Sequence, residues 1–89
     1  MKLNGKFVLR QVAGNWVVLP LSDATVNFNG MIKLNESGVM LWRLLEQGKD
    51  REALADMLTT VYDVSREIAL EDVDEFLNKL GRAGCIDLQ

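Results

Sequence analysis

The pattern of apolar residues changes character at Asn35. Before it, short apolar runs rich in β-branched and aromatic residues alternate with turn-forming residues, which predicts strands near residues 6–12, 16–20 and 31–34. After it, apolar residues recur every three or four positions, which predicts helices. We therefore expect an α+β fold: a small antiparallel N-terminal sheet, then three helices, then a short closing strand in "CIDL".

Turn residues set the limits of the strands. Ala13-Gly14-Asn15 lies between the first two apolar runs and predicts a hairpin with a short loop. Asn29-Gly30 predicts a second hairpin, in which residues 25–28 pair with 31–34, because both residues tolerate a positive φ. Pro20 has no backbone N–H, so it should end its strand or lie on an edge. Both faces of the first two strands carry apolar residues, and the pattern leaves open which one is inward.

Capping residues and glycines delimit the helices. Asn35 and Asp50 are good N-caps, Ser65 precedes the third periodic segment, and Gly48 is a helix stop. The expected helices run from Asn35 to about Gln47, from Asp50 to about Tyr62-Asp63, and from Ser65 to about Ala83. Their expected buried positions are Leu41, Trp42 and Leu45; Leu54, Met57, Leu58 and Val61; and Ala69, Val73, Phe76, Leu77 and Leu80.

Gly38 lies in the middle of the apolar face of the first helix. A glycine inside a helix costs about 1 kcal/mol relative to alanine. We expect another helix, or the sheet, to cross the first helix closely at this point, since glycine is used where backbones approach each other. The alternative is a glycine tolerated in the first turn.

The amino-acid composition excludes several classes of function. The 89 residues suit one domain, residues 1–89, with one modest core. There is no histidine and a single cysteine, Cys85, so the usual zinc and iron ligand sets and the commonest general base are missing. No apolar run approaches the roughly 20 residues of a membrane span, and "MKLNGKF" lacks a signal-peptide core, so we expect a cytoplasmic protein. These features predict a binding protein without a cofactor rather than an enzyme.

A family resemblance begins at Leu34. The run Leu34-Asn35-Glu36-Ser37-Gly38 leads into the helix that carries Trp42, and the third helix carries Asp72-Val73 and Phe76-Leu77. Over residues 30–88 the chain resembles the pyrroloquinoline-quinone synthesis D (PqqD) family of precursor-peptide recognition elements. The resemblance implies a winged-helix-like fold. It also implies that the protein binds the leader segment of a ribosomally made precursor peptide and presents it to a modifying enzyme, often a radical S-adenosylmethionine enzyme.

The resemblance also implies where the peptide binds. The leader would add as a β-strand along Met31, Ile32, Lys33 and Leu34, in a cleft shared with the third helix. The alternative role for Lys33 is that of a charge that protects an open sheet edge from aggregation. Met31 would be an adaptable residue of this cleft, because methionine suits variable partners.

The third helix has two flanks that could form the cleft wall. With Val73 at the centre of its buried face, one flank carries Ile68, Asp72, Glu75 and Lys79, and the other carries Leu70, Asp74 and Asn78. We favour the first flank, with its carboxylates receiving Lys or Arg of the leader. The alternative is an ordinary solvated helix face.

Other functions and roles stay open at this point. A DNA-binding winged helix would present basic residues to phosphates, whereas this helix has five acidic residues from Glu67 to Glu75. A homo-oligomerisation module, with a homodimer formed through the open strand, is a second alternative. Trp16 could be half exposed as a platform for a ligand, and Cys85 should be a small buried hydrophobe.

Overall fold

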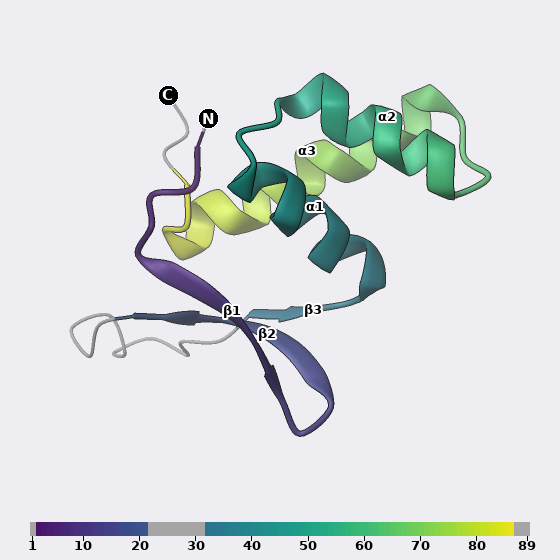
Figure 1. The fold of residues 1–89 in the computed structure, drawn as a ribbon. Coiled ribbons are helices and arrows are strands. Elements are labelled where there is room, and N and C mark those ends of the chain that lie inside the picture. Colours follow the sequence, from purple (N-terminus) through teal and green to yellow (C-terminus); the bar gives the residue numbers. More distant parts are fainter. Residues whose placement is uncertain (1, 22–31, 87–89) are drawn as a thin grey trace.

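The computed structural model describes residues 2–21 and 32–86, and in it three helices lie on one side of a small sheet (Figure 1). The sheet is antiparallel, in the order β1-β2-β3. The elements are β1 (Phe7–Val12), β2 (Asn15–Pro20), β3 (Ile32–Leu34), α1 (Glu36–Glu46), α2 (Arg51–Val61) and α3 (Arg66–Ala83). The predicted α+β class, with a sheet followed by three helices, is confirmed.

The hairpin of β1 and β2 forms where the turn residues predicted it. Ala13 and Gly14 both have a positive φ, 51° and 82°, which is the backbone of a primed two-residue turn. Such a turn matches the twist of the two strands that it joins. Pro20 is the last residue of β2, as expected. The predicted Asn29-Gly30 turn and the strand at 25–28 lie outside the described residues.

Strand pairing settles which face of the sheet is inward. Leu9 pairs with Val18, and Val18 pairs with Ile32, so these three residues form one row across the sheet. Val18 and Ile32 are buried in the core, and Leu9 packs against it. The neighbouring row therefore belongs to the outer face, on which Arg10 and Lys33 are exposed and Val17 between them is 3% exposed.

Each helix begins with a side chain that caps its first turn. Asn35 Oδ1 accepts from the Gly38 N–H at 2.9 Å, Asp50 Oδ1 accepts from the Ala53 N–H at 2.9 Å, and Ser65 Oγ accepts from the Ile68 N–H at 3.1 Å. These contacts satisfy backbone donors that have no partner within the helix. All three helix starts were predicted correctly. Gly48, with a φ of 81°, stops α1 as expected.

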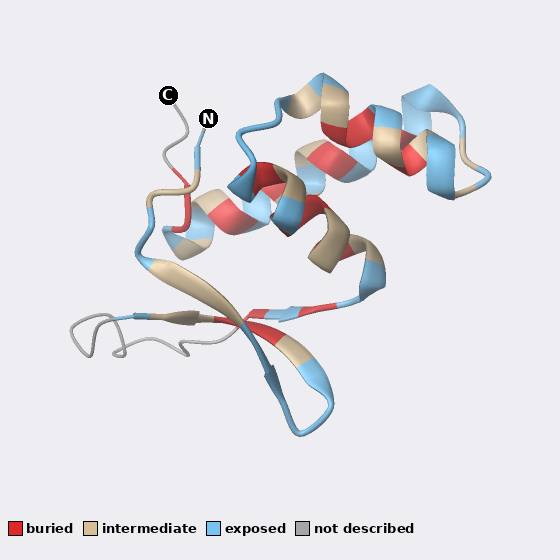
Figure 2. Cartoon of the chain, viewed as in Figure 1, coloured by how far each residue is buried: buried red, intermediate tan, exposed pale blue. Residues whose placement is uncertain are grey.

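The sheet and the helices share one apolar core, seen as the buried positions of both layers in Figure 2. Its members come from every helix and from β2 and β3, together with two residues that follow α3. They are Val18, Ile32, Leu34, Leu41, Trp42, Leu45, Leu54, Ala55, Leu58, Ala69, Val73, Leu77, Leu80, Cys85 and Ile86. Trp42 is 1% exposed, and its indole N–H donates to Glu46 Oε2 at 3.0 Å.

The buried face of α2 differs from the prediction. Leu54 and Leu58 are buried as expected, but Ala55 is buried in place of Met57, which is only partly buried, and Val61 is 53% exposed. The apolar stripe is therefore rotated toward Ala55, whose small side chain suits a position against a neighbouring element. Val61 was misplaced because it is the last residue of the helix, where the chain turns away.

Two assignments on α3 were also wrong. Phe76 was expected in the core, but it is only partly buried. Leu70 was expected on an outer flank, yet it packs against the core. Both lie at the borders of the buried face, where helical periodicity does not distinguish core from surface.

The residues that follow α3 pair with the residues that precede β1. Ile86 forms an isolated antiparallel bridge with Leu3, and the Asn4 N–H donates to the Cys85 carbonyl at 3.0 Å. Within the described residues the expected closing strand is thus a bridge, and the rest of "CIDL" lies outside them. Cys85 is buried as predicted, and this burial raises the pKa of its thiol to about 11.

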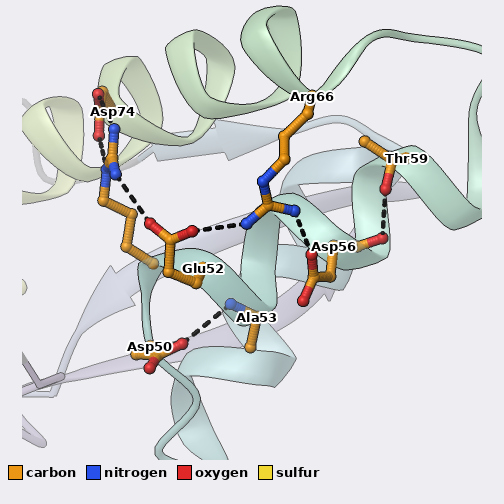
Figure 3. Close-up of polar contacts among 8 residues, drawn as sticks. Asp50, Glu52, Ala53, Asp56, Thr59, Arg66 and Asp74 are labelled. Carbon is orange, nitrogen blue, oxygen red and sulfur yellow. Dashed lines mark hydrogen bonds and ion pairs between the residues drawn. The ribbon is translucent and has the colours of Figure 1, made fainter.

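Ion pairs fix α3 against α2 on one flank only. Arg51 of α2 donates to both carboxylate oxygens of Asp74, at 2.6 and 2.9 Å. Arg66 of α3 reaches back to Asp56 and, at 2.5 Å, to Glu52 (Figure 3). A bidentate arginine–carboxylate pair has a defined geometry, so it agrees with the rotation of α3 that the burial of Ala69, Val73, Leu77 and Leu80 sets. The Asp74 flank is therefore turned toward α2.

The same contacts shift the acid–base equilibria of the charged groups. Hydrogen bonding to Arg51 lowers the pKa of Asp74, and hydrogen bonding to Asp74 raises the pKa of Arg51. Hydrogen bonds to Asp56 and Glu52 raise the pKa of Arg66. The charged form of each group is thus favoured by its partner.

Gly38 packs closely against the strand that precedes its own helix. A Cβ atom placed on Gly38 would lie 3.3 Å from Leu34 Cβ, 3.3 Å from Leu34 Cδ2 and 3.3 Å from Asn35 Oδ1. The close approach was predicted correctly, and of the two expected neighbours it is the sheet that lies there, through Leu34 of β3, together with the capping side chain of Asn35. Glycine thus permits the sharp corner between β3 and α1.

We predict effects of different size for two substitutions at this corner. Gly38→Ala should change the free energy of unfolding by less than about 1 kcal/mol, because the gain in helix propensity offsets the tight contacts. Gly38→Val should lower it by about 1–3 kcal/mol, since its extra methyl groups meet Leu34 and Asn35. Urea denaturation of both variants measures this, and equal stability of the two would contradict close packing at Gly38.

We also predict a pH-dependent effect of Asp74→Asn. The lowered pKa of Asp74 means that its ion pair stabilises the fold above the ordinary aspartate value of 3.8 and that this stabilisation disappears as pH falls through the lowered pKa. The variant should therefore be less stable than wild type at neutral pH, with a difference that narrows below about pH 4. Urea unfolding at several pH values tests this.

The matched control for that experiment is Glu71→Gln, which changes an exposed carboxylate of the same helix. Within the part of the chain that the structure describes, Glu71 forms no ion pair. Its stability difference from wild type should stay small at every pH. A difference for Asp74→Asn that widens on acidification would contradict the assigned ion pair.

Candidate functional site

A groove of about 570 Å³ lies between the end of β3, the first half of α1 and the middle of α3. The short strand and the cap of α1 provide one side, α3 provides the opposite wall, and α2 contributes Leu58. Its lining residues are Lys33, Leu34, Asn35, Ser37, Gly38, Leu41, Leu58, Asp72, Glu75, Phe76 and Lys79. The groove is thus built by four elements of the fold.

The apolar part of the groove draws one side chain from each of those elements. These side chains are Leu34 of β3, Leu41 of α1, Leu58 of α2 and Phe76 of α3. The three leucines also belong to the core, and Phe76 packs against it. The apolar lining is therefore held in place by the packed interior.

Charged residues line the remainder of the groove. Asp72, Glu75 and Lys79 follow one another at helical spacing along α3, and Lys33 comes from β3. All four are exposed. Among the described residues, none of them forms an ion pair. The groove therefore offers both signs of charge to a ligand, beside an apolar lining.

Five of the eight predicted site residues line this groove. They are Lys33, Leu34, Asp72, Glu75 and Lys79. Ile32 belongs to the core instead, Ile68 is 45% exposed and is not among the lining residues, and Met31 lies outside the described residues. The structure thus brings the third strand and the favoured flank of α3 to the same groove.

The two flanks of α3 have different surroundings. Asp74, on the flank that we did not favour, is held by Arg51 of α2. Asp72 and Glu75, on the favoured flank, face the groove. The ion pair with α2 thus lies on one flank of the helix, and the carboxylates of the other flank lie opposite β3.

Sequence reasoning missed the apolar half of the groove. Leu41, Leu58 and Phe76 were assigned to the core because they fit its periodicity. Phe76 carried a usable signal: on a helical wheel it lies between Val73, at the centre of the buried face, and the flank of Asp72 and Lys79. An aromatic residue at such a border is a candidate for the lining of a groove.

The polar residues Asn35 and Ser37 line the groove beside the start of α1. Ser37 Oγ donates to Asn35 Oδ1 at 3.0 Å, and the same oxygen caps the helix by accepting from Gly38. Asn35 therefore has a structural role that explains its place in the Leu34–Gly38 run. This run forms the corner at which strand, cap and groove meet.

Trp16 is partly buried and faces a different neighbour. The Arg43 guanidinium lies 5.3 Å from the centre of its ring, in a cation–π arrangement. Trp16 is not a lining residue of the groove.

The described residues contain no group of three or more Cys, Asp or Glu side chains that could hold a metal ion, and no described helix is long and apolar enough to cross a membrane.

Two solved structures resemble the chain over nearly its whole length. The first, "TbiB1 in Complex with the TbiA(beta) Leader Peptide", is 27% identical, with a TM-score of 0.80 over 100% of this chain and 98% of that one. The second, "Lasso peptide synthetase B1 complexed with the leader peptide", is 23% identical, with a TM-score of 0.74 over 93% of this chain and 92% of the other, and supports the fold alone.

A comparison of the sequence with models of protein families identifies the family of this chain. No curated protein sequence matches the chain significantly. The family model described as "Coenzyme PQQ synthesis protein D (PqqD)" matches residues 15–86, which include β2, β3 and all three helices. The fold, the Leu34–Gly38 corner and this match agree, and the chain belongs to the PqqD family.

Proposed function

We propose that this protein binds the leader segment of a ribosomally made precursor peptide and presents it to a modifying enzyme. The observation that carries the proposal is the groove between β3 and α3, which is lined by Lys33 and Leu34 on one side and by Asp72 and Glu75 on the other. The leader would add to β3 as a further strand and place its side chains in the groove.

The backbone of β3 suits strand addition. Among the described residues β3 is the last strand of the sheet and pairs only with β2. The backbone N–H and C=O groups of its second edge have no strand partner among the described residues, and such an edge is a template for pairing with another chain. Strand addition there excludes the hairpin that the Asn29-Gly30 turn predicts between residues 25–28 and 31–34. The side chains of Ile32 and Leu34 hold the strand in the core, so the edge is fixed before a peptide arrives.

The side chains of the groove would add selectivity to this backbone pairing. An apolar side chain of the leader would pack on Leu41, Leu58 and Phe76. Asp72 and Glu75 would receive a Lys or Arg of the leader in a charge-assisted hydrogen bond. Ile68 continues the same flank beyond the groove and would contact a longer leader segment.

Relatives support the same role. TbiB1 was solved with a leader peptide, and it matches this chain over its whole length at 27% identity. The chain also belongs to a family that is named for the synthesis of a coenzyme. The protein would act without chemistry of its own, in the cytoplasm, together with an enzyme that modifies the bound precursor. A radical S-adenosylmethionine enzyme is the class that we expect.

The edge of β3 that has no strand partner among the described residues also favours a second function, self-association. Two copies could pair edge to edge through Ile32–Leu34 and form a homodimer. This pairing would use the same backbone groups as the leader, so the two events would compete. DNA binding has less support, because the exposed carboxylates of α3 would repel phosphates.

We predict that charge reversal in the groove weakens peptide binding. The double variant Asp72→Lys, Glu75→Lys should bind a leader peptide that the wild-type protein binds at least about tenfold more weakly, since two attractive contacts become repulsive. Fluorescence anisotropy of the labelled leader measures the dissociation constant.

The matched control is Glu67→Lys, Glu71→Lys, which makes the same change of charge on the same helix. Neither residue lines the groove, and both are exposed. This control should keep the wild-type affinity within about twofold after the general change of charge is screened by salt. Equal weakening by both double variants, or none by the groove variant, would refute the assigned wall.

A further inference from the structure

We infer that Lys33 selects leaders that carry an aspartate or glutamate at the position opposite Lys33 in the added strand. The leader residue next to that position in sequence faces the groove. This inference rests on the proposed strand addition and specifies the chemistry of the peptide. The recognised segment would be an extended one in which two adjacent positions prefer opposite charges.

The side chains of β3 alternate between two faces of the sheet. Ile32 and Leu34 are 9% and 7% exposed and belong to the core, whereas Lys33 between them is exposed. Lys33 pairs with Val17 of β2, and Val17 pairs with Arg10 of β1. Lys33 therefore ends a row of residues on the outer face of the sheet, and it also lines the groove beside the edge where a strand would be added.

An added strand would continue these rows. Side chains that lie opposite each other in neighbouring strands are on the same face, with Cβ atoms about 4.5–5.5 Å apart. The leader residue opposite Lys33 would thus lie on the outer face, in contact with the lysine. Its neighbours on either side would point the other way, toward the groove and α3.

The outer row has only one sign of charge. Its described charged members, Lys33 and Arg10, are both basic, and neither forms an ion pair within the part of the chain that the structure describes. A carboxylate opposite Lys33 would gain a cross-strand ion pair, while a lysine or arginine would meet a like charge directly opposite. The row therefore distinguishes an acidic residue from a basic one.

The side of the leader that faces the groove has the opposite charge preference, for basic residues. Asp72 and Glu75 lie on the wall that the inward side chains of the leader would meet, with Lys79 one turn further along α3. A groove-facing residue beside these carboxylates would favour a Lys or Arg. Because successive residues of a strand alternate between faces, the acidic and the basic position fall next to each other in the leader. A shift by one residue would reverse both contacts, so the pair of charges also sets the register.

Selection from a displayed library of random ten-residue peptides tests this inference without a known precursor. Peptides are selected separately on immobilised wild-type protein, on Lys33→Glu and on the control Lys49→Glu, an exposed lysine that is not a lining residue of the groove. Circular dichroism melting checks that each variant is folded. Wild type should enrich sequences with an acidic position, in which Asp and Glu exceed Lys and Arg about threefold or more, next to a position that favours Lys or Arg.

The variants give distinguishable results. Lys33→Glu should reverse the preference at the acidic position alone, and Lys49→Glu should leave it unchanged. A synthetic peptide from the wild-type selection should bind Lys33→Glu about fivefold more weakly, and the same peptide with Lys at that position should regain most of the loss.

An acidic preference that survives Lys33→Glu, or that Lys49→Glu alters equally, would overturn the inference and leave peptide capture intact. Failure of wild-type protein to enrich any sequence would contradict the proposed function itself, and the inference with it.

Discussion

The burial of Ile32 and Leu34 is the constraint on which the rest of the structure depends. β3 has only three residues, too few to be stable as an isolated strand. Its two inward side chains are part of the core, and its backbone pairs with β2 on one side. The other edge is thereby held beside α3, so a groove exists between a fixed strand and a fixed helix. The corner of Leu34, Asn35 and Gly38 then directs the chain from this strand into α1.

The charged side chains of α3 lie in two different surroundings, one against α2 and one on the groove. Arg51 holds Asp74, and Arg66 contacts α2, so one flank of α3 stabilises the pairing of the two helices. Asp72 and Glu75 lie on the groove and have no ion-pair partner among the described residues. A helix that looks uniformly acidic in sequence thus has two functions, and its rotation separates them. This arrangement makes a peptide with basic side chains a better occupant than a nucleic acid.

Local features of the fold could be predicted from the sequence. The caps Asn35, Asp50 and Ser65 act through neighbours three residues away, and the Ala13-Gly14 turn acts through its own backbone, so each was predictable. The rotation of α2 was not, because burial of Ala55 in place of Met57 depends on contacts with elements distant in sequence.

The charged residues of the candidate site could be predicted from the sequence, whereas most of its apolar lining could not. The Asp72 and Glu75 flank of α3 follows from helical periodicity, and Lys33 follows from the family resemblance. Phe76 was assigned to the core because an aromatic residue at the border of a buried face has the same periodicity as a core residue. Only the placement of β3 beside α3 shows that its partly buried ring lines a groove. The corner at Gly38 was expected to be tight, but its partner Leu34 could be identified only in three dimensions.

The central claim is that a peptide pairs with the edge of β3 inside the groove. The most direct measurement is an amide chemical-shift titration of the labelled protein with a leader peptide that it binds, followed by intermolecular backbone NOEs. The account predicts shifts at Ile32–Leu34 and at the Asp72–Lys79 flank of α3, with NOEs between the peptide backbone and β3. Shifts confined to other surfaces, or peptide binding without contacts to the backbone of β3, would contradict it.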